Sequence, residues 1–505
     1  MKTKLTNISE LFLNAAKKHP NNVAIIDKND QSITYAQLAE DVKATAAYFQ
    51  RKGIGKGDRV LVFVPMGIDL YRIVLALFYI GATAVFLDEW VSKKRMELCC
   101  QLADCKGFIG VWKARIFALF SKELRRIPIK LSLKKKHKTG VPVTQVPPDT
   151  TALITFTTGS TGIPKAANRT HAFLREQFDA LLEEIHPKAR DVDMPVLPIV
   201  LFVNLGVGCT SVIADFKMTK PEAINEAVII EQINKHQVNR MIASPFFIKR
   251  LAQYAIEQKV ELPQIKKVVT GGAPVFPQEA TLYVKAFPQA TSMVVYGSTE
   301  VEPISSIDAQ TLSQAPETLP EGLPVGDIFH KTEVRIIRVS DGNIPACSAL
   351  ALDEMTLEDG VIGEIIVAGA HVLKQYFKND AAFRQNKIIV GNKIWHRTGD
   401  SGLKKGNQLL LTGRCAQLIE FEEGYLSPFI IENQLVNIAG VTMGTLLEMN
   451  QQRILVLESV LNKEILAPKV GNIPYDKLQV VAQIPRDARH HSKIDYGALK
   501  LQLGA

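Results

Sequence analysis

The sequence predicts an α/β protein with a large N-terminal domain, residues 1–415, and a small α+β C-terminal domain, residues 416–505. In the first half, short apolar runs alternate with helical patterns, which is typical of a parallel sheet covered on both faces. After about Gly326 the pattern changes to antiparallel strands with polar turns. A chain of 505 residues also exceeds the size of one hydrophobic core.

The first elements follow from local patterns. Thr34 and Gln37 form a capping-box pattern, and the apolar helical face that follows ends at Gly53. Residues 60–64 form an apolar strand that stops at Pro65, and another helix and strand come next. This repeated order indicates strand–helix units joined by crossovers.

Three later strands end in loops rich in glycine and hydroxyl side chains. The strands are expected at residues 153–156, 267–270 and 292–295. In open α/β sheets, ligands bind beyond the carboxyl ends of the strands. We therefore expect the three loops to converge on one site.

The C-terminal part carries short strands and one helix. Lys405, Gly406 and Asn407 predict a hairpin turn, whereas Ser427 and Pro428 predict the start of a helix.

The longest uncharged stretch, residues 194–214, raises the question of a membrane span. It contains two prolines, Pro195 and Pro198, and two glycines, Gly206 and Gly208. We interpret it as a buried strand and turn beside a ligand pocket.

The net charge of +9 is concentrated in one segment. Residues 113–138 hold ten Lys and Arg against one acid, Glu123, so the rest of the chain is close to neutral. The segment is either a solvated loop or a surface for an anionic membrane or an acidic partner, with Trp112, Phe117 and Phe120 interleaved. No nucleic-acid module accompanies it, so we expect no nucleic-acid partner.

No apolar run follows the amino terminus, and six cysteines without metal-ligand spacing suit a reduced compartment. We therefore expect a cytoplasmic protein.

The main chemical motif is a loop that can cradle an anion. It consists of Thr157, Thr158, Gly159, Ser160, Thr161, Gly162, Ile163, Pro164 and Lys165. The glycines let backbone N–H groups turn inward, the hydroxyls add donors, and Lys165 adds charge. It is not a Walker A loop, because the lysine follows Pro164 rather than glycine.

This loop resembles the phosphate loop of the acyl-adenylate-forming superfamily, which includes acyl-CoA synthetases, luciferase and peptide-synthetase adenylation domains. Further motifs follow in that family's order, at residues 33–38, 271–274, 296–300, 397–400, 413–414 with 424–425, and 491–494. The resemblance implies two stacked parallel-sheet α/β subdomains plus a β-barrel-like subdomain in residues 1–415. It also implies a small mobile domain that carries the catalytic lysine.

The resemblance also implies roles for individual residues in an AMP-forming acid ligase that uses ATP and Mg²⁺. The residues expected to bind ATP or AMP are Thr157, Thr158, Gly159, Ser160, Thr161, Gly162, Lys165, Gly272, Ala273, Pro274, Tyr296, Gly297, Ser298, Thr299, Asp400 and Arg414. The residues expected to act in catalysis are Lys493, Glu300, Thr299 and Lys165, with Glu300 also a ligand of Mg²⁺. The expected hinge residues are Cys415, Ala416 and Gln417.

Within these roles, Lys165 and its loop hold the β- and γ-phosphates, and Thr299 contacts the α-phosphate. Asp400 accepts from the ribose, and Arg414 reaches ribose or phosphate. Lys493 bridges the carboxylate and the α-phosphate. Attack of one anion on another needs positioning and charge neutralisation, which these residue types supply.

The sequence departs from the family at three places. Ala166 replaces a glycine, Ala416 and Gln417 replace the usual charged hinge residue, and a histidine is missing near the acyl pocket.

That acyl segment reads Leu201, Phe202 and Val203, which predicts a hydrophobic, fatty acid as the substrate. Transfer to the CoA thiol is the favoured second step, with CoA as co-substrate. Two alternatives remain open. The stretches 193–215 and 487–495 are similar to the β-lactone synthetases of bacterial olefin biosynthesis, in which a 3-hydroxyl closes on the adenylate without CoA. An inactive nucleotide- or acyl-binding homologue is the other.

Overall fold

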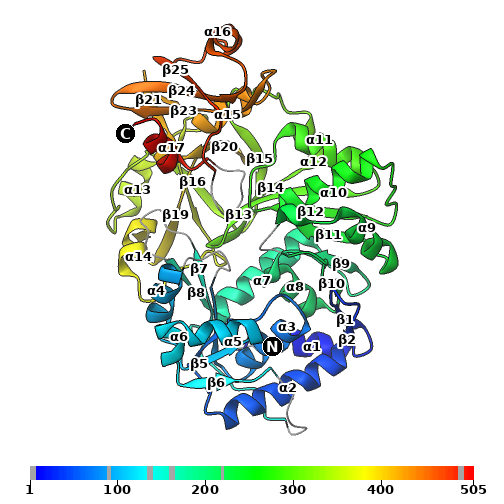
Figure 1. The fold of residues 1–505 in the computed structure, drawn as a ribbon. Coiled ribbons are helices and arrows are strands. Elements are labelled where there is room, and N and C mark those ends of the chain that lie inside the picture. The colour runs from blue at the N-terminus through cyan, green and yellow to red at the C-terminus, as the bar shows by residue number, and fades with distance from the viewer. Residues whose placement is uncertain are drawn as a thin grey trace.

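The computed structural model describes residues 7–87, 93–133, 140–157, 165–217, 221–422, 424–486 and 494–504. The predicted phosphate-loop residues from Thr158 to Pro164, and Lys493, lie outside these ranges. Figure 1 shows two α/β layers in the lower part of the view and the C-terminal segment at the top.

The first sheet has the strand order β6-β5-β3-β4-β7-β8, and every neighbouring pair is parallel except β7 with β8. Its strands are β3 (Arg59–Phe63), β4 (Thr83–Phe86), β5 (Gly107–Gly110), β6 (Ile129–Leu131), β7 (Thr151–Thr157) and β8 (Lys165–Thr170). Its connecting helices are α2 (Tyr35–Arg51), α3 (Ile68–Tyr79), α4 (Lys93–Ala103), α5 (Trp112–Leu119) and α6 (Lys122–Arg126).

Both faces of this sheet are buried, as predicted. Val60 and Val62 of β3 pack into a core shared with α2, α3, α1 (Ser9–Lys18), α7 (His171–Ile185) and α8 (Pro198–Val207). Leu61 packs on the other side with residues of α4 and α6. Alternate residues of a strand face opposite sides, so a continuous apolar run is what a doubly covered strand needs.

The second sheet has the order β16-β17-β19-β20-β15-β14-β13-β12-β11-β9-β10-β1-β2, with β18 paired to β19. Its first strands are β1 (Val23–Ile26), β2 (Ser32–Thr34), β9 (Val192–Pro195), β10 (Thr210–Val212), β11 (Arg240–Ala243), β12 (Lys267–Gly271) and β13 (Thr291–Ser298). The later strands are β14 (Val301–Asp308), β15 (Leu323–Ile328), β16 (Glu333–Ile337), β17 (Gly363–Ala368), β18 (Lys387–Val390), β19 (Lys393–Lys405) and β20 (Gln408–Arg414).

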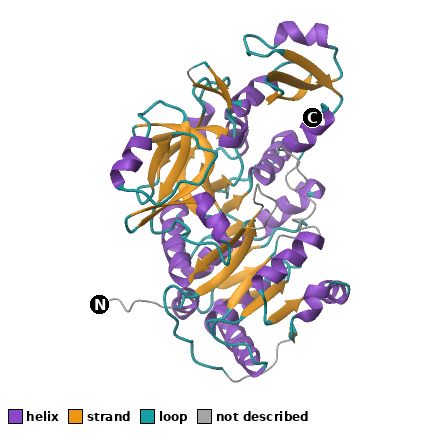
Figure 2. Ribbon diagram, turned by 90° about the vertical axis from the view of Figure 1, so that its left-hand side faces the viewer, coloured by secondary structure: helices purple, strands orange, loops and turns teal. Residues whose placement is uncertain are grey.

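This sheet changes character after β13. Strands β1 and β9 to β13 pair in parallel, whereas β14 to β20 pair antiparallel and curl into the barrel-like part that Figure 2 shows as a cluster of orange strands. The helices of this part are α1 (Ser9–Lys18), α7 (His171–Ile185), α8 (Pro198–Val207), η1 (Pro221–Ala223), α9 (Glu226–Lys235), α10 (Pro245–Glu257), α11 (Pro277–Ala286), α12 (Ala309–Ser313), α13 (Ala349–Met355) and α14 (Asp380–Asn386). The predicted fold class is confirmed.

Local signals place several elements where we expected them. Thr34 caps α2 through a capping box with Gln37, and the 405–408 segment is the turn between β19 and β20. One prediction is wrong: residues 194–214 hold the ten-residue helix α8 between two short strands, not a strand and turn. Pro198 occupies its first turn and Gly208 ends it at φ 92°, so the proline and glycine that argued against a membrane-spanning helix mark the two ends of a short one.

Sheet membership changes again after Arg414, beside the predicted domain boundary at residue 416. The remaining elements are η2 (Cys415–Gln417), β21 (Ile419–Phe421), β22 (Gly424–Leu426), α15 (Pro428–Leu435), β23 (Val441–Met449), β24 (Gln452–Ser459), α16 (Lys463–Leu466), η3 (Ala467–Lys469), β25 (Lys477–Val481) and α17 (Tyr496–Gln502). Ser427 caps α15 with Pro428 in its first turn, as predicted.

Among the described residues, no helix combines the length and the apolar character that a bilayer span requires.

Candidate active site

The site is built where β13 and β14 meet β19 and β20. Tyr296 lies near the end of β13, and Asp400 and Arg414 are register partners on β19 and β20. Tyr296 and Asp400 are separated by 104 positions in the chain, and the sheet brings them together. Tyr296, Asp400 and Arg414, three of the residues predicted to bind the nucleotide, therefore lie next to one another.

Asp400 is held from two sides. The Tyr296 hydroxyl donates to Asp400 Oδ2 at 2.7 Å, and Arg414 pairs with Oδ1 at 2.9 Å. The Thr398 hydroxyl accepts from the Asp400 backbone N–H at 3.0 Å. Burial and the adjacent Asp400 carboxylate raise the pKa of Tyr296 well above its usual value, so the hydroxyl stays a donor. The carboxylate is thus fixed in position by its tyrosine and its arginine.

Glu300 is fixed by the segment between β17 and α14. The Tyr376 hydroxyl donates to Glu300 Oε1 at 3.1 Å, and the Leu373 backbone N–H donates to the Glu300 carbonyl at 2.7 Å. Burial, with Glu300 nearby, raises the pKa of Tyr376, so this hydroxyl also remains a donor. Within the described part of the chain, the second carboxylate oxygen of Glu300 has no recorded hydrogen bond and can accept from another group or a ligand.

Lys165 opens β8 and is half-buried. Its ammonium donates to Asn386 Oδ1 at 2.9 Å. Burial lowers the pKa of Lys165, an effect that the Glu300 carboxylate opposes and Arg414 reinforces. Glu300 and Arg414 therefore both lie close enough to Lys165 to affect its protonation.

Two further basic side chains, Lys387 and Arg169, lie beside Tyr376 and Thr299. Lys387 begins β18, is buried, and donates to the Leu373 carbonyl, while its ammonium sits 5.6 Å from the Tyr376 ring centroid. Burial lowers the pKa of Lys387 to about 7, against the opposing pull of Glu300. Arg169 on β8 is buried and donates to the Thr299 carbonyl at 3.0 Å. Arg169 thus places a positive charge beside the Thr299 carbonyl, and Lys387 adds a second one when it is protonated.

The loop predicted to lie on the adenine side follows β12. Gly271 needs to be glycine because a Cβ there would lie 2.5 Å from the Val295 carbonyl oxygen on β13. Gly272 has φ 86°, which side chains rarely adopt, and it is exposed, with Ala273 and Pro274 following it. The turn therefore runs along the end of β13, close to Tyr296, Gly297 and Ser298.

Thr157 ends β7 opposite Lys165, so the two ends of the predicted phosphate loop are held together by a β pair. Thr158, Gly159, Ser160, Thr161 and Gly162 lie outside the described residues. Ala166 is fully buried and its methyl group packs with Phe156 in the core of the first sheet. The departure from glycine at this position is therefore absorbed by core packing.

The predicted acyl residues lie on α8. Leu201, Phe202 and Val203 are all buried, and the Phe202 ring meets Phe78 edge-on at 6.0 Å. Behind them, Asn204 Nδ2 donates to Asp193 Oδ2 at 2.7 Å. The helix is thus an apolar wall between the two sheets.

Asp193 and Asn204 form a buried polar pair beneath that wall. Burial raises the pKa of Asp193 to about 6, and one oxygen of each side chain has no hydrogen-bond partner within the described chain. Tyr35 braces the same corner through hydrogen bonds to the Asn204 and Cys209 carbonyls.

The predicted hinge, Cys415 to Gln417, is a short 3₁₀ turn between β20 and the small domain. Ala416 is exposed, and burial raises the pKa of the Cys415 thiol. On the C-terminal side of this turn, the Phe429 ring of α15 lies 5.4 Å from the Phe276 ring, tilted by 32°. Helix α15 therefore contacts both the large core and the small domain.

Lys493 lies outside the described residues, but the segments on either side of it are anchored. Arg486 and Ile494 form an antiparallel bridge, and Arg486 pairs with Glu458 of β24 at 2.9 Å. Tyr496 donates to the partly buried Glu432 of α15. The small-domain sheet thus carries both ends of the predicted catalytic-lysine segment.

The described residues could hold a magnesium ion only together with the phosphates of a bound nucleotide. Within the described residues there is no group of three or more His, Cys, Asp or Glu side chains that could hold a metal by itself. Mg²⁺ usually takes one or two carboxylates and completes its shell with phosphates and water. Glu300, with one oxygen held by Tyr376, suits that partial role.

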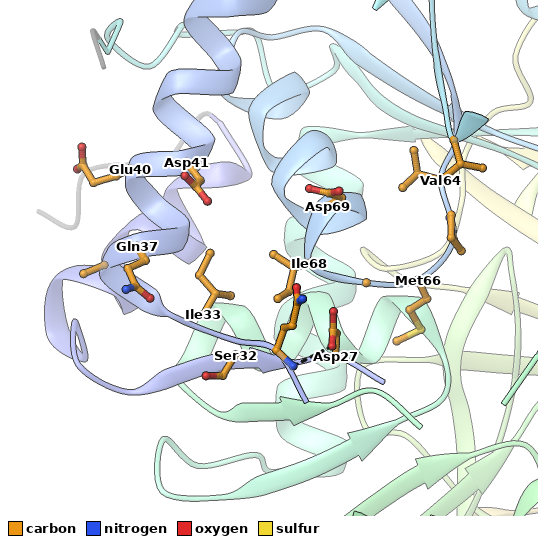
Figure 3. A pocket seen from close by; sticks show the side chains of 15 residues that line it. Asp27, Ser32, Ile33, Gln37, Glu40, Asp41, Val64, Met66, Ile68 and Asp69 are labelled. Atoms are coloured by element: carbon orange, nitrogen blue, oxygen red, sulfur yellow. Dashed lines mark hydrogen bonds between the residues drawn. The ribbon is translucent and has the colours of Figure 1, made fainter. Parts of the chain in front are cut away.

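A separate cavity of about 880 Å³ lies at the start of α2 and α3 and the end of β3 (Figure 3). Figure 3 shows Glu40, Asp41, Asp27 and Asp69 around it, with Met66 on one wall. Its described lining includes four carboxylates and no lysine or arginine. It is therefore unsuited to a triphosphate, and it contains none of the predicted site residues.

The sequence did not point to Tyr376, Asn386, Lys387 or Arg169. Tyr376, Asn386 and Arg169 each contact a residue more than seventy positions away, whereas Lys387 contacts the nearby Leu373 carbonyl and is affected by the distant Glu300 charge. The one available signal was Lys387 itself, a lysine opening the apolar segment 387–390, where a charge needs a reason.

Comparison with known proteins agrees with this geometry. A family model described as AMP-binding enzyme matches residues 12–377. The chain belongs to the AMP-binding enzyme family, and it is an adenylate-forming enzyme. The expectation of that superfamily is confirmed.

Two curated relatives are olefin β-lactone synthetases. That of Xanthomonas campestris is 29% identical over 463 residues, covering 84% of this chain and 81% of the relative. That of Stenotrophomonas maltophilia is 26% identical, covering 97% of this chain and 96% of the relative. A 4-coumarate–CoA ligase of Humulus lupulus is 24% identical, covering 83% of this chain and 77% of that relative.

Solved structures share the fold. The O-succinylbenzoate coenzyme A synthetase of Bacillus subtilis, in complex with ATP and magnesium ion, has a TM-score of 0.79 at 20% identity over 97% of this chain and 99% of that chain. A Mycobacterium tuberculosis fatty acyl CoA synthetase has a TM-score of 0.74 at 19% identity, covering 99% of this chain and 98% of that chain.

Proposed function

We propose that this enzyme adenylates a hydrophobic 3-hydroxy acid with ATP and then closes it to a β-lactone. The observation that carries the proposal is the similarity to two olefin β-lactone synthetases over 84% and 97% of the chain, at higher identity than the CoA ligases. The predicted CoA-dependent transfer becomes the second candidate.

In the first step, a carboxylate oxygen attacks the α-phosphorus of ATP and pyrophosphate leaves. Lys165 neutralises the β- and γ-phosphates, and Asp400 accepts from the ribose hydroxyls while Tyr296 and Arg414 hold it in place. Fixed donors aimed at developing charge need no reorganisation during the reaction. Bound Mg²⁺ would supply further charge neutralisation at the phosphates.

Two other residues act at the reacting centre in this proposal. Thr299 contacts the α-phosphate. Arg169 donates to the Thr299 carbonyl at 3.0 Å and so holds the 298–300 turn in place. Lys493 bridges the carboxylate and the α-phosphate as the anhydride forms. Glu300, held by Tyr376, would be the carboxylate ligand of Mg²⁺.

In the second step, the 3-hydroxyl oxygen attacks the acyl carbon. The bond from that carbon to the AMP oxygen breaks, AMP leaves, and the hydroxyl proton is lost. Both reacting groups belong to one molecule, so the step needs folding of the substrate and exclusion of water. The buried wall of Leu201, Phe202 and Val203 suits an apolar chain held against α8.

The second candidate is transfer to the CoA thiol after a rotation at Cys415 to Gln417. It is favoured by the similarity to a 4-coumarate–CoA ligase and by the fold shared with CoA synthetases. An inactive binding homologue is less well supported, because Lys165, Glu300, Asp400 and Arg414 are assembled in one site.

One experiment separates the candidates. The purified enzyme receives ATP, Mg²⁺ and a long-chain 3-hydroxy acid, with and without CoA, and the products are identified by mass spectrometry. We expect lactone and AMP without CoA and no thioester on its addition. Adenylate that accumulates and clears as thioester when CoA arrives would establish the ligase instead. No pyrophosphate exchange with any hydrophobic acid would establish the inactive homologue.

A further inference from the structure

Helix α5 turns an apolar stripe outward. Trp112, Ile116 and Leu119, with Phe120 immediately after the helix, recur at the spacing of one helical face. Their exposed fractions are 66%, 48%, 64% and 71%. A surface helix of a globular protein normally turns such a stripe toward the core, so this orientation is reversed.

The inward face of α5 explains the reversal. Ala118 is buried and Ala114 is partly buried in the core of the first sheet. A Cβ on Gly110 of β5 would lie 3.0 Å from Ala114 Cβ, so the helix backs closely onto the strand. Small residues allow that approach, which leaves the large apolar side chains in water.

Basic side chains border the stripe. On a helical projection, Lys113 lies on one side of it and Arg115 on the other, and both are exposed. The adjoining helix α6 adds exposed Lys122 and Arg125. The same surface holds one acid, Glu123, which is already paired with Arg126 at 3.0 Å.

This surface lies apart from the proposed active site. Figure 1 draws α5 and α6 in the lower part of the molecule, whereas β19, β20 and the C-terminal segment lie above. Helix α5 also contributes no residue to the site. The exposed apolar side chains therefore have no role in the chemistry proposed above.

We propose that the α5–α6 surface docks on an anionic lipid bilayer. Trp112, Ile116, Leu119 and Phe120 enter the boundary between headgroups and acyl chains, and the flanking lysines and arginines contact lipid phosphates. An exposed apolar patch marks an interaction site, and Trp with Lys and Arg is the composition that suits this boundary.

The positive charge of the α5–α6 surface favours an anionic bilayer over a second copy of the chain as its partner. In a symmetric pair, the same positive surface would face itself and repel. A negatively charged leaflet is complementary to it and extends over the whole surface. At eight residues, α5 spans about 12 Å and lies along the membrane plane instead of crossing it.

The test is flotation of the full-length protein with vesicles of phosphatidylcholine alone or mixed with phosphatidylglycerol. We expect binding to the mixed vesicles, lost at high salt and weak on the neutral ones. The double variant Lys113→Gln, Arg115→Gln should bind roughly thirtyfold more weakly, because each base near the surface contributes about a factor of five.

The apolar stripe is tested with the double variant Trp112→Ser, Phe120→Ser, which should abolish flotation. The matched control is the double variant Leu350→Ser, Val460→Ser. Leu350 and Val460 are 69% and 100% exposed and lie outside the α5–α6 surface. Pyrophosphate exchange should be unchanged in both. Flotation unaffected by the α5 variants, or loss in the control alone, would overturn the proposal.

Trp112 also reports directly in the unmodified protein. Anionic vesicles should shift its emission to the blue, and lipids with brominated acyl chains should quench it, compared with Trp112→Phe. An unchanged spectrum would exclude insertion of α5. Dimerisation that depends on the stripe without vesicles, seen by light scattering, would assign the surface to a second copy instead.

Discussion

Lys165 donates a hydrogen bond to Asn386 Oδ1 at 2.9 Å, although the two residues lie 221 positions apart. The bond joins the start of β8 to the last residue of α14 and sets the direction of the ammonium. In the proposed mechanism that ammonium meets the β- and γ-phosphates. Asn386 therefore positions the charge without touching the nucleotide.

Replacing Asn386 by Asp should weaken ATP binding. A fixed carboxylate would pair with Lys165 and compete with the phosphates, so we expect the KM for ATP to rise roughly tenfold or more. Asn386→Ala, which removes the bond without adding charge, should have a smaller effect. ATP–pyrophosphate exchange measures both, and an unchanged KM in Asn386→Asp would show that Lys165 does not bind the phosphates.

Removing the Tyr296 hydroxyl should loosen Asp400. The Tyr296→Phe variant keeps the Arg414 pair but loses a hydrogen bond to a charged group, and we expect about tenfold weaker ATP binding by calorimetry. The control is Tyr283→Phe, which removes a buried bond to the Pro245 carbonyl at 3.2 Å on α10 and α11. If both variants bind ATP equally well, Asp400 needs no support from Tyr296.

The buried Lys387 predicts an unusual pH dependence of stability. Its folded pKa is about 7 against 10.5 for an ordinary lysine. Between those values the unfolded chain binds the proton and the folded chain does not, so this group's contribution raises stability as pH increases. Below pH 7 both states are protonated, and the cost of burying the charge is complete.

Lys387→Met should therefore stabilise the protein most at low pH. Urea unfolding should show the variant a few kcal/mol more stable than the parent near pH 6, and this difference in unfolding free energy should shrink toward pH 10. Parallel curves would mean that Lys387 keeps its proton throughout.

The two predicted catalytic lysines should separate by their readouts. Lys493→Ala should lower pyrophosphate exchange at least about a hundredfold while ATP binding stays within about threefold, because the residue acts on the developing anhydride. Lys165→Ala should weaken ATP binding itself. Near-normal exchange in Lys493→Ala would show that another residue bridges the carboxylate and the α-phosphate.

Much of the fold was predictable because its signals are local. The capping box of Thr34 and Gln37, the turn at Gly406 and the cap at Ser427 each depend on a few neighbouring residues. Helix α8 was missed because its proline and glycine could mark either a turn or the two ends of a helix. The tertiary setting of the two sheets decides between them.

The site divides in the same way. Motif residues such as Asp400 and Glu300 could be named from sequence through their resemblance to a family. Their supports could not, since Tyr376 and Lys387 make tertiary contacts that no local sequence pattern encodes. The outward stripe of α5 also depends on packing, because periodicity gives a face but not its direction.

Oxygen labelling of the substrate tests the central claim most directly. A 3-hydroxy acid whose two carboxylate oxygens are heavy isotopes is converted with ATP, and AMP and lactone are weighed by mass spectrometry. The mechanism predicts one heavy oxygen in AMP and one in the lactone carbonyl, since the carboxylate attacks phosphorus and the 3-hydroxyl then attacks carbon. Unlabelled AMP together with a doubly labelled lactone would show that ATP activates the hydroxyl instead, and would contradict the adenylate.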